Sequence, residues 1–387
     1  MSERIICAID RNIVIFEDGD CRLLSSKFID QYCANHEQII RKRAWKSDGY
    51  GARFRMEQPS TGIEQTRQIL NSASITGIAS IGGDDIIFCV MVGDSSGLFR
   101  RSIDPHAADI EGHILHDRGL LFQDVTISSD GRMAFSILNN NGEQNIAVSE
   151  IGSPQYRELT EGDSVDRNPF WDPRNPDIVI FDSAPIAYEN NGAMIVCPRS
   201  IMKADLKNSE IETIIESDKY DFINPQVDSE GNIWCIRRPY KTAHNNLSFL
   251  DLLLIPYKIG RAIFRAIEIF TVRNTGEPLI TSGSNPSKAR FAPNDQIFEG
   301  KKIDAERNIR QNMKSGDSFP GYIPRNWELI QIDQDRKISV RAKSVCSFTL
   351  LAGNSFIYSN GKFLFKSTDG NIVKIDEAIL PTKIIVA

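Results

Sequence analysis

Cofactor and disulfide signatures are missing from this chain of 387 residues. Its seven cysteines are scattered at positions 7, 21, 33, 89, 197, 235 and 346, without a Cys-x-x-Cys pair. An odd number of isolated thiols, some inside apolar runs such as Phe88-Cys89-Val90, favours reduced core residues. Neither a glycine-rich phosphate loop with lysine nor a dinucleotide-binding fingerprint occurs. We therefore expect no cofactor.

Long apolar runs and an excess of basic residues are missing as well. The net charge is −6, which disfavours a general nucleic-acid binder because phosphate affinity needs a basic surface. The apolar run Ile5–Ile9 near the amino terminus is too short for a signal peptide, so a cytoplasmic protein is expected. The most apolar segment, residues 246–273, contains no run near the roughly 20 residues that a membrane-spanning helix needs.

One sequence phrase is repeated three times, in residues 124–136, 168–183 and 224–237. Each copy reads as a short strand, a turn led by an acidic residue, and a second strand of β-branched and aromatic residues. Asp130-Gly131 and Glu230-Gly231 supply the turn chemistry, since glycine accepts positive φ. The copies recur at about 45–55 residues, the period of propeller blades, which are four-stranded sheets stacked around an axis.

At these residues the chain resembles a known family. The run 157–173 (RELTEGDSVDRNPFWDP) resembles the repeat of TolB-like, WD-repeat-like β-propellers, although the Asp-Gly expected after Pro173 is missing. The wider resemblance is to bacterial proteins of this type, some associated with MoxR-type AAA ATPases and von Willebrand A proteins. It implies a cytoplasmic bacterial protein whose partner is an AAA ATPase or a von Willebrand A protein, and a role in a defence system.

The remaining segments complete the predicted architecture. Meanders near both ends indicate one all-β propeller spanning residues 1–387, with about six four-stranded blades, closed by strands from both termini; the tail 383–387 is the candidate closing strand. Residues 26–46 have helical spacing and form a helical excursion. Residues 241–325 form a helical and loop insertion within or between blades, with one helix expected over residues 303–313.

The insertion is the best candidate for function. The spacing of residues 246–273 predicts a helix with an apolar face and, opposite to it, a basic face. Pro256 and Gly260 are expected to bend or break this helix. An internal cap on the propeller and a partner-docking element are both consistent with this pattern. The candidate partner-binding residues are Phe249, Leu253, Tyr257, Arg261, Phe264, Arg265, Arg237, Arg238 and Arg325. A third interpretation is membrane-surface association through residues 249–270.

Catalytic and metal signals are weaker. His106, His113 and His116 lie near carboxylates, but without the His-Glu-x-x-His pattern we expect a solvated loop, with a metal site as the alternative. Trp327 is expected to be a core aromatic residue rather than an interface anchor. The favoured function is a non-catalytic protein-interaction scaffold. The alternative is a hydrolase or lyase with its site in the central channel of the ring.

Overall fold

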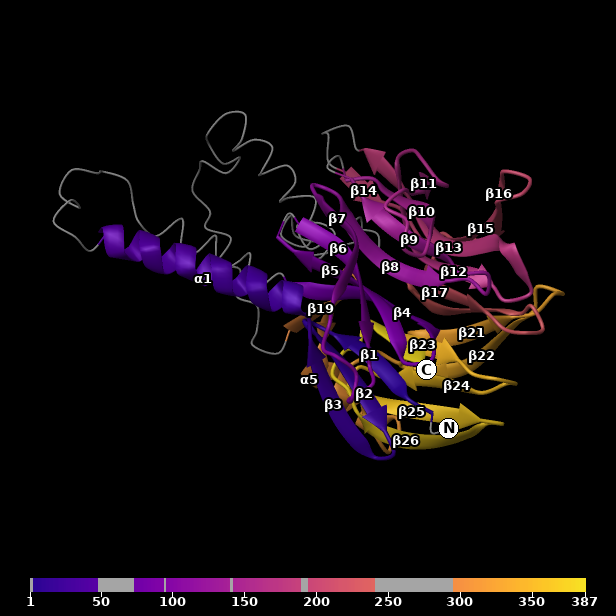
Figure 1. Cartoon of the computed structure of the whole chain (residues 1–387). Helices are drawn as coiled ribbons and strands as arrows, with labels where there is room; N and C mark the ends of the chain where they lie inside the picture. Colours follow the sequence, from indigo (N-terminus) through magenta and orange to yellow (C-terminus); the bar gives the residue numbers. More distant parts are fainter. Residues whose placement is uncertain (1–2, 48–72, 94, 140–141, 189–193, 241–294) are drawn as a thin grey trace.

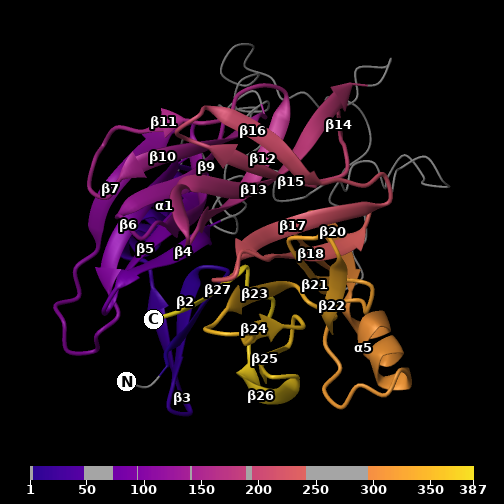
Figure 2. The ribbon, with the colours of Figure 1, turned by 90° about the vertical axis from the view of Figure 1, so that its right-hand side faces the viewer.

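A computed structural model describes residues 3–47, 73–93, 95–139, 142–188, 194–240 and 295–387. Strands dominate these residues, and the two helices among them are α1 (Lys27–Ser47) and α5 (Ala305–Lys314). The sheets are arranged around a common axis, as Figures 1 and 2 show. The predicted all-β, propeller-like architecture is therefore confirmed.

The first sheet contains strands from both ends of the described chain. Its order is β27 (Lys383–Val386), β1 (Ile5–Ile9), β2 (Asn12–Glu17) and β3 (Asp20–Ser25). β27 runs antiparallel to β1, with Ile5 opposite Val386 and Ala8 opposite Lys383. The segment expected to close the ring thus occupies the inner position of the sheet that begins the chain.

Three further four-stranded sheets repeat the same order from the axis outwards. One contains β4 (Ser74–Gly82), β5 (Asp85–Val92), β6 (Ser95–Ser102) and β7 (Gly112–Arg118). Another contains β17 (Tyr220–Val227), β18 (Ile233–Pro239), β21 (Glu328–Ile332) and β22 (Ile338–Lys343). The last contains β23 (Ser347–Leu350), β24 (Phe356–Ser359), β25 (Phe363–Thr368) and β26 (Asn371–Glu377).

The predicted number of separate blades is wrong. Among the described residues, four sheets are four-stranded, one large sheet has nine strands and one hairpin sheet has two, so six separate four-stranded blades do not form. The large sheet contains β8 (Leu121–Ile127), β9 (Arg132–Leu138), β10 (Gln144–Glu150), β11 (Arg157–Glu158), β12 (Ser164–Asp172), β13 (Asn175–Tyr188), β14 (Met194–Val196), β15 (Ser200–Asp205) and β16 (Glu210–Ile215). The physical reason is a parallel pairing of Gln144 with Val165, which joins β10 to β12.

The repeated phrase has a structural basis at its first residue. Asp124, Asn168 and Asn224 all have left-handed φ angles, of 52°, 50° and 53°. Each lies where the inner strand shifts register against its neighbour, in a β-bulge. Aspartate and asparagine tolerate this conformation better than other residues with a Cβ, and a bulge re-aims nearby side chains. The phrase therefore encodes a bend in three inner strands.

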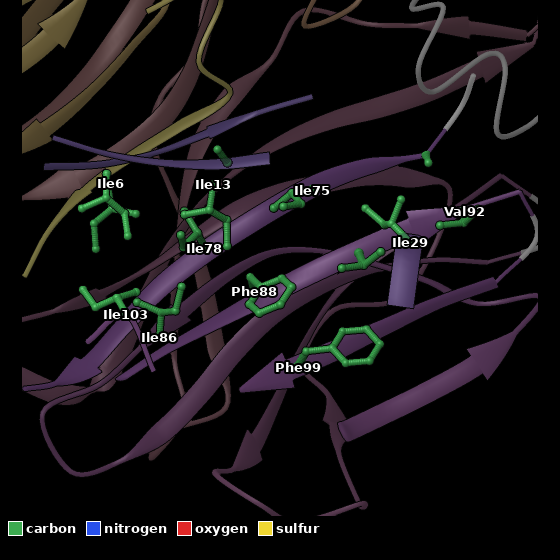
Figure 3. Close-up of a cluster of buried hydrophobic side chains, with 14 residues drawn as sticks. Ile6, Ile13, Ile29, Ile75, Ile78, Ile86, Phe88, Val92, Phe99 and Ile103 are labelled. Carbon is green, nitrogen blue, oxygen red and sulfur yellow. The ribbon is translucent and has the colours of Figure 1, made fainter. Parts of the chain in front are cut away.

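Apolar side chains fill the spaces between neighbouring sheets. The cluster in Figure 3 brings Ile6 and Ile13 of the first sheet against Ile75, Phe88 and Phe99 of the next. Each of these side chains is at most 1% exposed. A single four-stranded sheet cannot bury the apolar residues of both its faces, so each sheet packs against its two neighbours.

Two excursions leave the ring. α1 follows β3 where a helix was expected over residues 26–46; its first turns pack through Phe28 and Ile29, and it extends away from the sheets in Figure 1. The second lies between β18 and β21. Its described part is the hairpin β19 (Asp295–Phe298) and β20 (Lys301–Asp304), followed by α5, which covers most of the helix predicted over residues 303–313.

At Gly77 the inner strand β4 comes close to the inner strand β8 of the next sheet. A Cβ atom there would lie 2.7 Å from the backbone nitrogens of Asp124 and Val125, on the next inner strand. Because backbone cannot move aside as a flexible side chain does, we expect Gly77→Ala to lower the free energy of unfolding by about 1–3 kcal/mol. Chemical denaturation would measure it.

Gly112→Ala is the matched control, since it lies in the same sheet and the nearest atom to its added Cβ would be 3.8 Å away. If both variants lose the same free energy of unfolding, the loss in Gly77→Ala does not come from a steric clash between β4 and β8.

Candidate functional site at the axis of the ring

The bulged residues place polar side chains along the axis. The Asp124 carboxylate accepts a hydrogen bond from Nε of Arg167 at 3.0 Å, so the inner strands β8 and β12 are ion-paired. Asn168, the next bulged residue, donates from Nδ2 to Oδ2 of Asp182 at 2.7 Å. The backbone N–H of Asn224 donates to the same oxygen at 2.9 Å. One carboxylate therefore links two successive inner strands.

Asp182 is the most enclosed member of this group. Its side chain is fully buried and forms a salt bridge with Arg199, which is also buried. Arg199 additionally donates its backbone N–H to Oδ1 of Asp221 at 3.2 Å. An isolated buried carboxylate would be costly, and here its oxygens are shared among a guanidinium, an amide and a backbone N–H.

Asp221 forms the next node. Nε of Arg238 donates to its Oδ2 at 3.1 Å, and Nζ of Lys301 lies 2.7 Å from the same oxygen. Burial disfavours the charged form of Asp221, but the neighbouring Arg238 and Lys301 outweigh it, so the pKa of Asp221 is lowered. The Arg238 guanidinium also lies over the ring of Trp327, 4.8 Å from its centroid.

The hairpin β19–β20 contributes two charges to this cluster. Glu299 occupies its turn with a φ of 44°, and its Oε2 accepts from Nη1 of Arg167 at 2.6 Å. Lys301, two residues later, reaches Asp221. Since this hairpin belongs to the insertion, residues 241–325, the insertion is ion-paired to the axis at two points.

Lys383 closes the cluster from the last strand. It is 8% exposed, and its Nζ donates to Oδ1 of Asn224 at 3.1 Å. Burial lowers the pKa of its ammonium group, although the carboxylates of Asp124 and Asp182 nearby favour the charged form. The closing strand β27 is therefore attached to the inner strand β17 through an amide, while ion pairs join most of the other members.

The described part of the cluster contains nearly balanced charge. The positive members are Arg167, Arg199, Arg238, Lys301 and Lys383, and the negative members are Asp124, Asp182, Asp221 and Glu299. Each carboxylate accepts from at least one of these cations. Groups committed to one another in this way hold strands in register and bind the insertion.

The predicted partner-binding residues fall into two sets. Phe249, Leu253, Tyr257, Arg261, Phe264 and Arg265, with the proposed membrane segment 249–270, lie outside the described residues. Of the others, Arg238 is buried within the axial cluster, where a partner could not reach it. Arg237 pairs with Glu328 and lies over Tyr220, and the partly exposed Arg325 pairs with Asp317. Trp327 is 4% exposed, so its prediction as a core residue is confirmed.

The three histidines considered as metal ligands, His106, His113 and His116, lie in β7 and in the loop before it. An extra residue in β7 brings His113 and His116 to the same face, where they pack against Phe99 and Phe28 at ring-centroid distances of 4.7 and 5.4 Å. His106 lies in the loop before β7, and its backbone N–H donates to Asp104. Within the described ranges, no group of three His, Cys, Asp or Glu side chains could hold a metal ion.

Two features escaped the reading of the sequence. The axial cluster was missed, although the Asp or Asn that starts each repeat was a signal for its bulges. Residues 93–97 also match the pattern Gly-x-Ser-x-Gly of a nucleophile elbow. That elbow requires a strand followed by a helix, whereas here β5 leads into β6 and Ser95 is buried at the start of the strand. The match therefore has the wrong structural context.

Neither of the two helices in the described residues is long and apolar enough to cross a bilayer.

Structural comparison identifies the fold. TolB from Acinetobacter baumannii aligns with a TM-score of 0.50 and 12% identity, over 99% of this chain and 66% of TolB. A TolB-like protein from Agrobacterium tumefaciens aligns with a TM-score of 0.41 and 10% identity, over 80% and 82% of the two chains. The tricorn protease gives 0.43 and 10% identity, over 100% of this chain and 36% of the protease. The chain thus spans just under two thirds of TolB and about a third of the tricorn protease.

Neither a protein-family model nor a curated protein sequence matches the chain. At 12% identity, the similarity to TolB establishes a TolB-like β-propeller fold.

Arg167 and Lys383 should differ in their importance to the ring. Arg167→Met leaves the buried Asp124 carboxylate and Glu299 without their shared cation, which costs about 3–5 kcal/mol of stability. Lys383→Met removes a buried ammonium whose hydrogen-bond acceptor is a neutral amide, so a smaller loss is expected. Urea unfolding of the two variants measures both. A larger loss for Lys383→Met would show that closure of the ring, rather than the ion pairs, dominates stability.

Proposed function

We propose that this TolB-like β-propeller is a non-catalytic scaffold that docks a protein partner through its insertion, residues 241–325, and through loops at the same end of the ring. The observation that supports this proposal most directly is the pairing of β18 with β21, in which Ile233 lies opposite Ile332 and Arg237 opposite Glu328. These strands are direct neighbours in the sheet, so the connection between them adds nothing to the hydrogen bonding of the blade. A segment of this kind is free to serve another purpose.

The described part of the insertion is firmly attached to the ring. Glu299 and Lys301 are ion-paired to Arg167 and Asp221, and Phe298 and Ile303 are buried with Trp327 in a small apolar cluster. Polar and apolar contacts thus join the hairpin β19–β20 to the ring. A partner bound to the insertion would be connected to a rigid body rather than to a loose tether.

The axial cluster supports binding rather than catalysis. Its carboxylates are engaged by arginine and lysine side chains, and a general acid or base needs a group that can exchange a proton with a substrate. The described residues at the axis therefore do not support the alternative function, a hydrolase or lyase with its site in the central channel.

The proposed partner class rests on the wider resemblance of the chain to bacterial TolB-like propeller proteins. An AAA ATPase of the MoxR type or a von Willebrand A protein, acting with this chain in the cytoplasm, is the proposed partner. Its contacts would involve the apolar and basic side chains of the insertion named above, Phe249, Leu253, Tyr257, Phe264, Arg261 and Arg265.

Excision of residues 246–273 tests the docking role. Replacing them by a flexible linker should preserve the thermal unfolding transition, because β18 and β21 still pair directly. Partners captured by the tagged full-length chain would be purified and titrated against both proteins. We expect the excised protein to bind at least tenfold more weakly, a loss of about 1.4 kcal/mol.

A control excision of residues 50–70, in the long connection after α1, should leave affinity unchanged. If the protein lacking residues 246–273 is folded and retains full affinity for every captured partner, the insertion is not the docking element.

A further inference from the structure

A pocket of about 480 Å³ lies between two neighbouring sets of strands. One side is formed by β13, β15 and β16, and the other by β17, β18 and the turn after β21; Figure 2 shows these strands next to one another. β18 begins at Ile233 beside the pocket and ends at Pro239, where the connection containing the insertion starts. The pocket and the point where this connection begins therefore lie at opposite ends of β18.

The walls of the pocket are aliphatic. They are formed by Ile178, Ile180, Ile214, Val227, Ile233 and Ile332. Ile214 and Ile233 are half-buried, while the others are at most 5% exposed, so most of the aliphatic lining is already shielded from solvent. A space of this size, bordered by branched aliphatic groups, accommodates an aliphatic side chain and part of its backbone.

Most charges at the rim are already engaged. Asp172 pairs with Arg174, and Lys203 pairs with Glu212, both at 2.8 Å. Asp205 and Asp333 accept hydrogen bonds from backbone N–H groups of their own turns.

Arg336 is the exception at this rim. It is exposed, has a left-handed φ of 62° in the turn between β21 and β22, and its guanidinium has no partner among the described residues. A guanidinium presents a planar fork that matches a carboxylate. Arg336 is therefore the one cation of the rim without a carboxylate partner among the described residues, and a ligand carboxylate would pair with it through two oxygens.

The strand beside the pocket adds a further requirement. β16 is the outermost strand of its sheet, and within the described residues its outer edge has no pairing strand. Glu212, Thr213 and Ile214 of β16 line the pocket. An edge strand offers backbone N–H and C=O groups to an extended chain, which a fatty acid could not use.

We propose that this pocket binds the carboxyl terminus of a peptide that ends in an aliphatic residue. The aliphatic side chain enters between Ile214 and Ile233, the terminal carboxylate pairs with Arg336, and the preceding backbone lies along the edge of β16. This site is independent of the insertion, and it would allow the ring to hold a second protein on its opposite face.

Binding of a short fluorescein-labelled peptide ending in leucine, measured by fluorescence anisotropy on the full chain, tests the site. The peptide with a free carboxylate should bind saturably, and its amidated form about tenfold more weakly, because a charge-assisted hydrogen bond is lost. Arg336→Glu should weaken the free-acid peptide at least tenfold. Arg310→Glu, on exposed α5, is the matched control and should change nothing.

Thermal unfolding of both variants confirms that each is folded. No saturable binding, or equal binding of the free and amidated peptides, would overturn the proposal. So would unchanged affinity in Arg336→Glu. Octanoate that competes as strongly as the peptide would assign the pocket to free aliphatic acids and would also overturn the peptide assignment.

Discussion

Mutual neutralisation of buried charges around the axis is the constraint on which the ring depends. Inner strands of a propeller converge, and at that point there is little room for large apolar side chains. In this protein the bulges at Asp124, Asn168 and Asn224 turn polar groups towards the centre, where Arg167, Asp182 and their neighbours join one strand to the next. The axial ion pairs hold the inner strands in register, and apolar contacts between neighbouring sheets stabilise the rest of each blade.

The same cluster explains why the long connection between β18 and β21 is tolerated. Antiparallel neighbours normally require only a short turn, and a long insertion adds a loop-closure cost that grows slowly with length. Ion pairs from Glu299 and Lys301 return the chain to the ring before β21 begins. The insertion thus leaves and re-enters the fold near the same buried charges.

The sequence predicts the repeats of this fold better than it predicts the site. Turn pairs such as Asp130-Gly131 and the apolar runs that follow them are local signals, and glycine at 131 has the positive φ that the turn requires. Axial contacts join residues far apart in the chain, such as Arg167 with Glu299 and Lys383 with Asn224. No local periodicity encodes these pairs. The blade count failed for a similar reason, since one pairing between Gln144 and Val165 merges two meanders.

Pairing of β27 with β1 has a consequence for biosynthesis. Thr382 donates to the carbonyl of Ala8, a contact that spans 374 positions. During translation, β1 must wait for nearly all the remaining strands to leave the ribosome before its inner neighbour exists. Until then the nascent ring is an open arc with an unpaired edge, which chaperones or premature partners could occupy.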